Sequence, residues 1–421
     1  MNEHSVSVNG ISIYSLTNPN LRSFCLSLYV RAGSIFEDLS NNGISHLFEH
    51  VVFRNIKNKY ENFYELLAMH GLCFQGSTYK KFVSFTIDGP QHEFDFAIEI
   101  LCGLFDEIKL TSHDFNNEKG RIKAEIREKD RRSSLDFYFD SIVWKNSEVE
   151  KIVLGYCKTI DRVSVKKINE FRQKVLSAGN CFVYATGNIS DENLDALNKK
   201  ISELDISQSN PGFTNTVTVN NEFFHREKKI WIKNNYWHYI QIGFDVDCSK
   251  YPGGVYDLLY ALLFNGDKAL VYNYLSEDNP IIYSYDSAFA QYDNVGNINF
   301  SFEVDRNKIE DVFKTVVELL NAAKDGRFNF EANLNYEMFN WELDLDKPSN
   351  LNWNMAYYNH ILKTEPIDYS DEFYGRFRVT KKQVTDAAKD IFRRCNMTVA
   401  VKGDRKKINA EAIEKILESL D

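Results

Sequence analysis

An internal repeat constrains the fold of this chain more than any other feature of its sequence. Residues 163–168 lead through a helical pattern to a strand-like run at 180–188, and residues 379–384 lead in the same way to a run at 396–404. Both segments of the second copy lie 216 residues after the first (163 to 379, 180 to 396), and no gap is needed. A fixed offset of this kind predicts two homologous domains.

Each copy of the repeat carries the same helix and strand signals. Ser164 and Thr380 can cap a helix, because their hydroxyl groups accept from main-chain N–H groups of the first turn. Each helix is predicted to end near an asparagine, Asn180 or Asn396, because asparagine tolerates the left-handed conformation. An apolar strand follows and stops at glycine plus asparagine or aspartate, which is a turn pair.

The length and local composition indicate where the domains divide. A chain of 421 residues exceeds what one hydrophobic core usually organises. A cluster of Ser, Asn, Pro and Gly begins at Ser207, and such clusters are typical of linkers. We expect an N-terminal domain at 1–206 with the metal site, a linker at 207–221, and a C-terminal domain at 222–421 without metal ligands.

The first half mixes strand and helix patterns. Alternating apolar residues predict strands at 24–30 and 82–87, and amphipathic stretches predict helices at 93–104, 116–132 and 191–204. We therefore predict an α+β fold of two homologous α/β-sandwich domains. Each is expected to be a mixed or antiparallel sheet with helices covering one face.

Bulk properties exclude several classes of partner. The net charge of −10 disfavours nucleic acid, whose phosphates select basic surfaces. No apolar run approaches the roughly 18 residues of a membrane span, and the N-terminus has no secretory or mitochondrial presequence pattern. The seven cysteines are scattered and never spaced as CxxC, so we expect buried thiols in a reducing cytoplasm.

Two histidines four residues apart are the strongest chemical signal. Gly43 and Ser45, a potential helix cap, precede His46 and His50, which would share one face of a helix and could present two imidazoles to one ion. Glu49 projects near the same place and could accept a proton. The alternative is an amphipathic turn whose two imidazoles are merely solvated.

A zinc site with one open position needs a third protein ligand. Glu118 and Glu125 stand two helical turns apart in a charged helix, so they share a face, and one could ligate while the other orients a histidine. The alternative is an ordinary solvated face with salt bridges. Spacing alone does not choose between Glu118, Glu125 and Glu128.

Taken together, these features resemble the M16 family of zinc metallopeptidases, which includes pitrilysin, insulin-degrading enzymes and the mitochondrial processing peptidase. The HxxEH order at residues 46–50 reverses the commoner HExxH. The approach residues 31–34, 37–38 and 43, the downstream glutamates at 118 and 125, and the repeated unit that ends each half all fit the family pattern. The similarity covers nearly the whole chain.

The resemblance implies a role for each matching residue. His46, His50 and Glu125 are expected to hold one zinc ion, with Glu49 as the general base that activates water and Glu118 as a supporting carboxylate. Residues 75–78 stand where the family has an edge strand that pairs with the substrate backbone. In this chain Gln75 replaces asparagine and Gly76 replaces alanine.

The second half departs from the family pattern. The position 216 residues after His46 is Leu262, in an apolar run without ligands. Active relatives offer an arginine and a tyrosine here that close over the substrate carbonyl. Tyr283 is present, but Asn279 stands at the arginine position, followed by Pro280. We therefore expect a zinc-bearing chain that pairs with a homologous partner chain as a heterodimer, or alternatively a homodimer.

The predicted function is that of a zinc-dependent endopeptidase acting on peptides or small unfolded proteins, as the zinc-bearing chain of a two-chain enzyme. One alternative is a non-catalytic or weakly active subunit that binds a partner or a peptide. Another is a zinc hydrolase of non-peptide substrates. Nothing in the sequence names the peptide substrate.

Overall fold

The computed structural model describes residues 3–128, 134–213, 217, 231–233, 238–363 and 377–420. The chain forms two compact units. Unit 1 comprises Met1–Lys129, Lys151–Thr216 and Glu342–Ser370, and unit 2 comprises Asp130–Glu150, Val217–Trp341 and Asp371–Asp421. Of the expected linker, residues 207–213 and 217 are described, and 214–216 and 218–221 lie outside the described residues, as do positions 129–132 of the expected helix 116–132.

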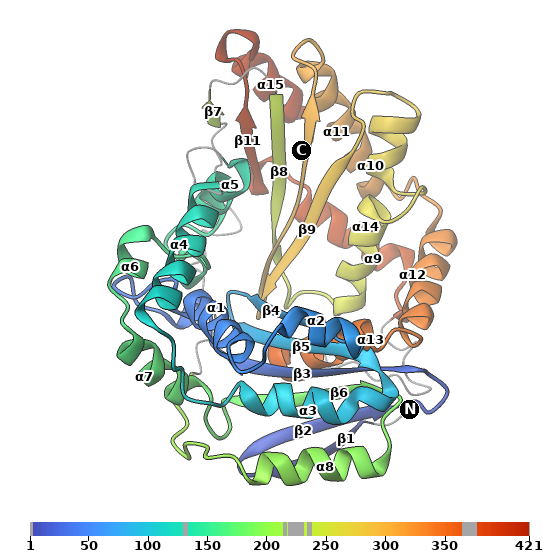
Figure 1. Cartoon of the computed structure of the whole chain (residues 1–421). Helices are drawn as coiled ribbons and strands as arrows, with labels where there is room; N and C mark the ends of the chain where they lie inside the picture. The colour runs from blue at the N-terminus through green and yellow to red at the C-terminus, as the bar shows by residue number, and fades with distance from the viewer. Residues whose placement is uncertain are drawn as a thin grey trace. The chain divides into compact units, whose positions relative to one another are not determined.

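Unit 1 contains a six-stranded mixed sheet in the order β1-β2-β6-β3-β5-β4 (Figure 1). Only β2 and β6 pair in parallel, and the other neighbours are antiparallel. The strands are β1 (His4–Val8), β2 (Ile11–Thr17), β3 (Ser23–Arg31), β4 (Cys73–Thr78), β5 (Phe82–Pro90) and β6 (Cys181–Gly187).

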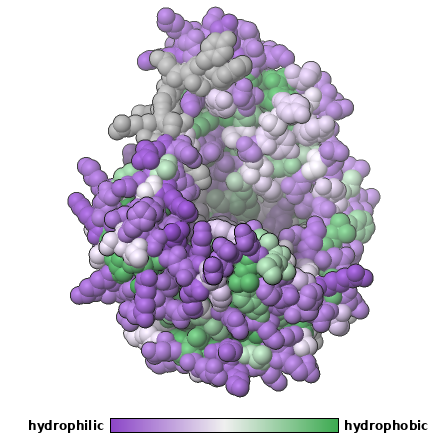
Figure 2. All heavy atoms as spheres, viewed as in Figure 1, coloured by the Kyte–Doolittle hydropathy of each residue, from purple (hydrophilic) through white to green (hydrophobic). Residues whose placement is uncertain are grey.

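The helices of unit 1 surround this sheet. They are α1 (Ile44–Lys57), α2 (Phe63–Met69), α3 (Phe94–Gly103), α4 (Ser112–Glu128), α6 (Cys157–Asp161), α7 (Val165–Val175), α8 (Asp191–Ser202) and α13 (Pro348–Met355), which continues into a π-helical turn at Ala356–Leu362. The predicted strands and helices of the first half are present with small shifts at their ends. The surface of this unit is mostly hydrophilic in Figure 2, with scattered apolar side chains.

Alternation along β3 explains why the sheet is covered on two faces. Leu26 and Leu28 are fully buried in the main core, which they share with Leu47 of α1. Tyr29 points to the other face, where its hydroxyl group donates to the side chain of Asn352 in α13 (2.9 Å). Our expectation of helices on one face was therefore incomplete, because α13 covers the second face.

Unit 2 contains a five-stranded mixed sheet in the order β7-β11-β8-β10-β9, in which only β7 and β11 are parallel. The strands are β7 (Trp231–Lys233), β8 (His238–Asp247), β9 (Tyr285–Tyr292), β10 (Val295–Val304) and β11 (Met397–Lys402). The helices are α5 (Leu135–Val143), α9 (Gly253–Phe264), α10 (Leu270–Tyr272), α11 (Ile309–Lys324), α12 (Phe330–Asp344), α14 (Lys381–Ile391) and α15 (Ala410–Leu417). The predicted α+β class with mixed sheets is confirmed.

Each unit includes one helix from the other half of the chain: α13 of the second half belongs to unit 1, and α5 of the first half belongs to unit 2. Helix α13 packs on β3 and β6, and α5 packs on β11 and β8. Asn352 of α13 donates to the main-chain carbonyl groups of Tyr184 (2.9 Å) and Cys25 (3.3 Å). These contacts join residues far apart in sequence, and local patterns do not reveal them.

The helix caps of the repeat are as predicted. Ser164 accepts from the main-chain N–H of Lys167 (3.2 Å), and Thr380 accepts from that of Gln383 (3.3 Å). The two hydroxyl groups thus begin α7 and α14 in the same way. The repeat is therefore present in the local structure as well as in the sequence.

Each repeat helix ends near its asparagine as predicted, but the left-handed conformation expected for the two asparagines was wrong. Neither Asn180 nor Asn396 has a positive φ. Instead, the amide group of Asn180 donates to the carbonyl of Val175 at the end of α7 (2.7 Å), and that of Asn396 donates to Ile391 at the end of α14 (2.9 Å). The amide group of Asn180 also donates to the carbonyl of Arg31 at the end of β3, and that of Asn396 donates to the carbonyl of Asp245 in β8. Asparagine is needed here for its two amide donors, not for its backbone freedom.

The helices and the cysteines bear on the expectations drawn from the bulk properties of the sequence. Within the described ranges, none of the helices combines the length and apolar composition needed to cross a membrane. The expectation of buried thiols holds fully for Cys25 and Cys181 and is wrong for the exposed Cys73 and Cys395, and the other three cysteines (Cys102, Cys157 and Cys248) are half-buried. Cys73 is the first residue of β4, and Cys395 lies two residues before β11. The sequence carries no clear burial signal at either place.

Candidate metal centre

The start of α1 is fixed by a buried carboxylate. Gly43 precedes the helix in the left-handed conformation (φ 94°), and a Cβ atom there would lie 2.8 Å from the carbonyl oxygen of Leu154. The Glu37 carboxylate accepts from the main-chain N–H of Gly43 (2.7 Å) and of Ser45 (2.8 Å). The carboxylate therefore accepts from main-chain N–H groups at the start of the helix that have no acceptor within the helix.

Ser45 does not cap the helix, contrary to expectation. Its hydroxyl group instead accepts from the main-chain N–H of Gly33 (2.9 Å), which ties the preceding loop to the helix. Glu37 also accepts from the side-chain amide of Asn42 (2.8 Å). Burial raises the pKa of the Glu37 carboxyl, and these hydrogen bonds act in the opposite direction.

Helix α1 presents both histidines on one face. The His46 and His50 rings lie with their centroids 4.7 Å apart at 84° to each other, and His46 is only 6% exposed. Leu47, Phe48 and Val51 on the opposite face are fully buried in the core of unit 1. Packing of the apolar face thus fixes the direction in which the imidazoles point.

Helix α4 lies beside α1 and supplies the carboxylates (Figure 1). Glu125 Oε2 lies 3.6 Å from His46 Nε2. One ligand atom each from His46, His50 and Glu125 lies within 4.8 Å of the others. Two ligands of a tetrahedral zinc ion, each about 2.0–2.1 Å from the metal, are about 3.3 Å apart. The donor types and the spacing therefore fit one zinc ion after a small contraction.

The structure distinguishes the three glutamates of α4 between which spacing could not choose. Glu125 belongs to the cluster, Glu118 is 2% exposed and lies against His50, and Glu128 is exposed. Glu118 Oε2 is 3.5 Å from His50 Nδ1. Contact with Nδ1 leaves Nε2 of His50 available for a metal.

Charge and burial act on His50 in opposite directions. Burial lowers its pKa, but the hydrogen bond to Glu118 and the negative charges of Glu49, Glu118 and Glu125 outweigh burial and raise it. The carboxylates thus favour a cation at this place. A divalent metal ion at this place would be attracted by the same negative charges.

Glu49 lies beside the cluster and contacts β4. Its Oε2 atom is 4.0 Å from His46 Nε2 and accepts from the hydroxyl group of Thr78 (3.0 Å). Burial raises the pKa of Glu49, while His50 and the Thr78 hydrogen bond lower it. Sequence reasoning missed this contact, because Thr78 is 29 residues from Glu49 and no pattern links the two.

Strand β4 is an edge of the unit 1 sheet and pairs with β5 alone among the described strands. Its outer edge therefore offers main-chain groups to an added strand. Gly76 of β4 faces Glu49, and a Cβ atom there would lie 2.7 Å from Glu49 Oε1. The glycine at this position consequently leaves room for the carboxylate.

The residues expected from the second half lie in unit 2. Tyr283 belongs to unit 2, precedes β9, and has a side chain 97% exposed. The side chain of Asn279 donates to the carbonyl of Tyr274 (3.1 Å). Leu262 is buried in α9, an apolar helix.

Family models match most of the chain. The model for "Insulinase (Peptidase family M16)" matches residues 13–155, and that for "Peptidase M16 inactive domain" matches residues 162–332. Both His46 and Glu125 lie within the first match, and Tyr283 lies within the second.

Curated relatives are distant in sequence. The uncharacterized zinc protease YmxG of Bacillus subtilis is 21% identical over 324 residues, which cover 75% of this chain and 77% of that protein. The β subunit of the mitochondrial processing peptidase of Saccharomyces cerevisiae is 24% identical over 190 residues, which cover 44% of this chain and 41% of that protein.

Solved structures show the same fold. A protease from Helicobacter pylori superposes with a TM-score of 0.82 at 18% identity, covering 96% of this chain and 99% of that one. An M16 inactive-domain protein from Pseudomonas fluorescens superposes with a TM-score of 0.80 at 14% identity, covering 96% and 98%.

Proposed function

The chain belongs to peptidase family M16, and from this membership and the geometry of its cluster we propose that it is a zinc-dependent endopeptidase acting on peptides or small unfolded proteins. The observation that carries the proposal is the convergence of His46, His50 and Glu125 within 4.8 Å, with the Glu49 carboxylate beside them.

In this proposal His46, His50 and Glu125 hold one zinc ion. Zinc, when bound, supplies Lewis acidity that polarises the scissile carbonyl and lowers the pKa of water. Glu49 would accept a proton from the water that attacks the carbonyl and pass it to the leaving amine. Glu118 holds the His50 ring through Nδ1, and Thr78 holds one oxygen of Glu49.

The open edge of β4 is the proposed binding place for the peptide backbone. A substrate strand added there would form main-chain hydrogen bonds that do not depend on side-chain identity. Because Gly76 and Thr78 of β4 both contact Glu49, a strand on this edge lies next to the proposed base. The edge thus supports binding and the cluster supports hydrolysis.

We further propose that a homologous chain completes the enzyme. Asn279 cannot supply the positive charge that the family arginine brings to the substrate carbonyl. The yeast relative is itself named as a subunit, which supports pairing. Sedimentation of the chain alone and mixed with a candidate homologous chain tests this: a heterodimer is expected, and a stable homodimer that ignores the second chain would contradict it. The expected cytoplasmic location stays a prediction.

The main alternative is a non-catalytic or weakly active subunit that binds a partner or a peptide. Its support is Asn279 and the match of residues 162–332 to the inactive-domain model. The Glu49→Gln variant separates the two functions, since it keeps the shape of the side chain and removes the base. Glu61→Gln, at an exposed position outside the cluster, is the matched control.

We expect Glu49→Gln to retain zinc and lose peptide cleavage by at least about a hundredfold, the usual contribution of a general base. Glu61→Gln should cleave as the unaltered chain does. Equal cleavage by both variants would reject the proposed mechanism. Zinc binding with no cleavage by the unaltered chain, alone or with its partner, would favour the binding subunit.

A further inference from the structure

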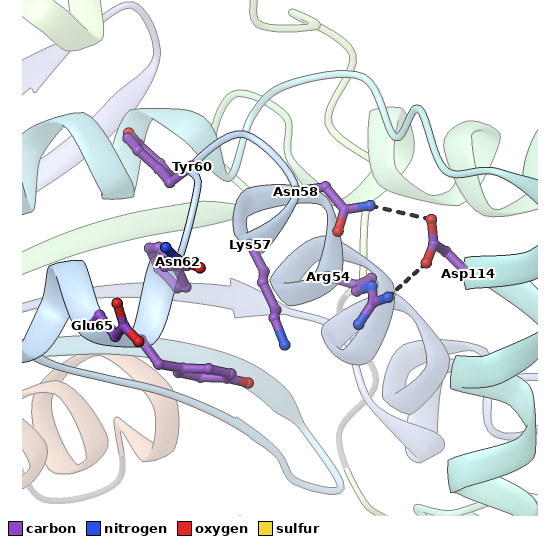
Figure 3. A pocket seen from close by; sticks show the side chains of 9 residues that line it. Arg54, Lys57, Asn58, Tyr60, Asn62, Glu65 and Asp114 are labelled. Atoms are coloured by element: carbon purple, nitrogen blue, oxygen red, sulfur yellow. Dashed lines mark hydrogen bonds and ion pairs between the residues drawn. The ribbon is translucent and has the colours of Figure 1, made fainter.

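A hollow of about 330 Å³ in unit 1 adjoins the candidate metal centre. Glu49 and His50 of α1 line one end, and Gly76 of β4 lines one side. Lys57, the last residue of α1, and Tyr64 of α2 also line it. A second hollow of about 700 Å³, whose lining side chains Figure 3 shows, shares Arg54, Lys57 and Tyr64 with the first, so the two adjoin. A groove therefore leads from the metal centre past Lys57.

Lys57 is the cation of this groove whose charge is not offset. Arg54 pairs with Asp114 (2.6 Å), and Arg121 Nη1 lies 3.7 Å from Glu118. In Figure 3 the dashed lines join Arg54 and Asn58 to Asp114, and none reaches Lys57. Over the described ranges, no carboxylate lies within ion-pair distance of Lys57, not even that of Glu65 in the outer hollow.

Two aromatic rings that line the groove already contact another side chain on one face. Lys57 Nζ lies over the Tyr64 ring, 4.4 Å from its centroid, and this contact holds the ammonium group in place. Phe53 stacks on Phe74 with centroids 4.7 Å apart and planes at 4°. A substrate carboxylate would give Lys57 an anionic partner, which its contact with the Tyr64 ring does not supply.

The edge strand directs a substrate side chain into this hollow. Side chains of neighbouring residues on paired strands point to the same face of a sheet. The Cβ position of Gly76 points at Glu49, so a substrate residue paired beside Gly76 projects toward α1. Because Gly76 has no side chain, it adds no bulk beside that substrate residue, and the space at its own Cβ position is taken by the Glu49 carboxylate. The residue concerned is next to the peptide bond at the metal centre.

We propose that this hollow is a specificity pocket for an acidic side chain, in which Lys57 binds the carboxylate of an aspartate or glutamate adjoining the scissile bond. The proposal rests on the proposed peptidase function. It assigns Lys57 to substrate binding and leaves the metal ligands and Glu49 in the roles given above.

The test uses matched decapeptides. Cleavage of a randomised decapeptide mixture, read by mass spectrometry, locates the positions beside the scissile bond. Peptides that differ only by Glu or Gln at each of those positions are then compared. We expect the Glu peptide to be preferred at one position by about tenfold in kcat/KM, the usual effect of a charge-assisted hydrogen bond.

Variants of Lys57 decide whether this residue is responsible. Lys57→Gln should bring the Glu-to-Gln ratio close to one, and Lys57→Glu should prefer a Lys peptide. Lys59→Gln is the matched control, because Lys59 pairs with Asp106 outside the groove, and it should keep the preference. An unchanged ratio in Lys57→Gln, or no Glu preference at either position, would overturn the proposal.

Binding separates failure of the pocket from failure of the peptidase function. The fluorescence anisotropy of labelled Glu and Gln peptides is measured on the zinc-loaded Glu49→Gln variant, with and without Lys57→Gln. Tighter binding of the Glu peptide that needs Lys57 supports the pocket even if no peptide is cleaved. Cleavage without any difference in binding or rate between the two peptides rejects the pocket and leaves the peptidase function standing.

Discussion

Replacement of Glu37 by alanine should destabilise the chain, because this carboxylate holds the start of α1. Glu37 is 3% exposed and accepts three hydrogen bonds, from the main-chain N–H groups of Gly43 and Ser45 and from the amide of Asn42. The Glu37→Ala variant leaves these donors without an acceptor in a place that water reaches poorly.

The expected loss can be worked out from these bonds. A buried donor that loses its partner costs about 1–3 kcal/mol, so three donors cost about 3–9 kcal/mol. Removal of a buried charge returns part of this, because burial disfavours the ionised carboxylate and raises its pKa. We expect a net loss of about 3–4 kcal/mol for Glu37→Ala. Glu37→Gln keeps one acceptor oxygen and should lose less.

Urea unfolding measures this loss, with Asp38→Ala as the matched control. Asp38 is the next residue and is exposed, and its side chain should contribute less than about 0.5 kcal/mol. Zinc affinity should fall along with stability in Glu37→Ala, because the first turn of α1 carries His46. A free energy of unfolding no lower in Glu37→Ala than in Asp38→Ala would refute the role given to Glu37.

Other predictions concern the carboxylate behind His50 and the thiols. Glu118→Gln should weaken zinc affinity by about 10–100-fold in a chelator competition, because the support of the His50 ring is reduced; unchanged affinity would contradict this. In metal-free protein the pKa of His50 is raised in the folded chain, so protonation of this ring stabilises the fold. This stabilisation is fully present below the pKa of a histidine in the unfolded chain, about 6.5. It is lost as the pH rises through the raised pKa of the folded chain. Urea midpoints of Glu118→Gln should therefore show less of this pH dependence, and an unchanged dependence would contradict the pairing. Iodoacetamide at pH 8 should label the exposed Cys73 and Cys395 long before Cys181, whose pKa burial raises to about 12, and early labelling of Cys181 in mass spectra would contradict its placement.

Local, periodic features of this chain could be predicted from the sequence. The caps at Ser164 and Thr380 follow from residue type and position relative to a helical pattern. The shared face of His46 and His50 follows from helical geometry alone. The edge strand expected at residues 75–78, which the structure has at Cys73–Thr78, came from resemblance to a family, since periodicity does not tell an edge strand from a central one.

Features that depend on distant residues could not be predicted in this way. Spacing left the choice between Glu118, Glu125 and Glu128 open. The family resemblance assigned Glu125 as a ligand, and the packing of α4 on α1 places Glu125 in the cluster and Glu118 against His50. Helix α13 covers the unit 1 sheet through Asn352, whose partners lie more than 160 residues away. Tertiary packing, which no local window contains, decides such contacts.

Metal content per chain tests the central claim most directly. The purified chain, dialysed against a weak chelator and measured by inductively coupled plasma mass spectrometry, should hold one zinc ion. His46→Ala and Glu125→Ala should hold none, and Glu128→Gln, which alters an exposed glutamate on the same helix, should hold one. Equal zinc in His46→Ala and the unaltered chain, or no zinc in either, would contradict the proposed metal centre.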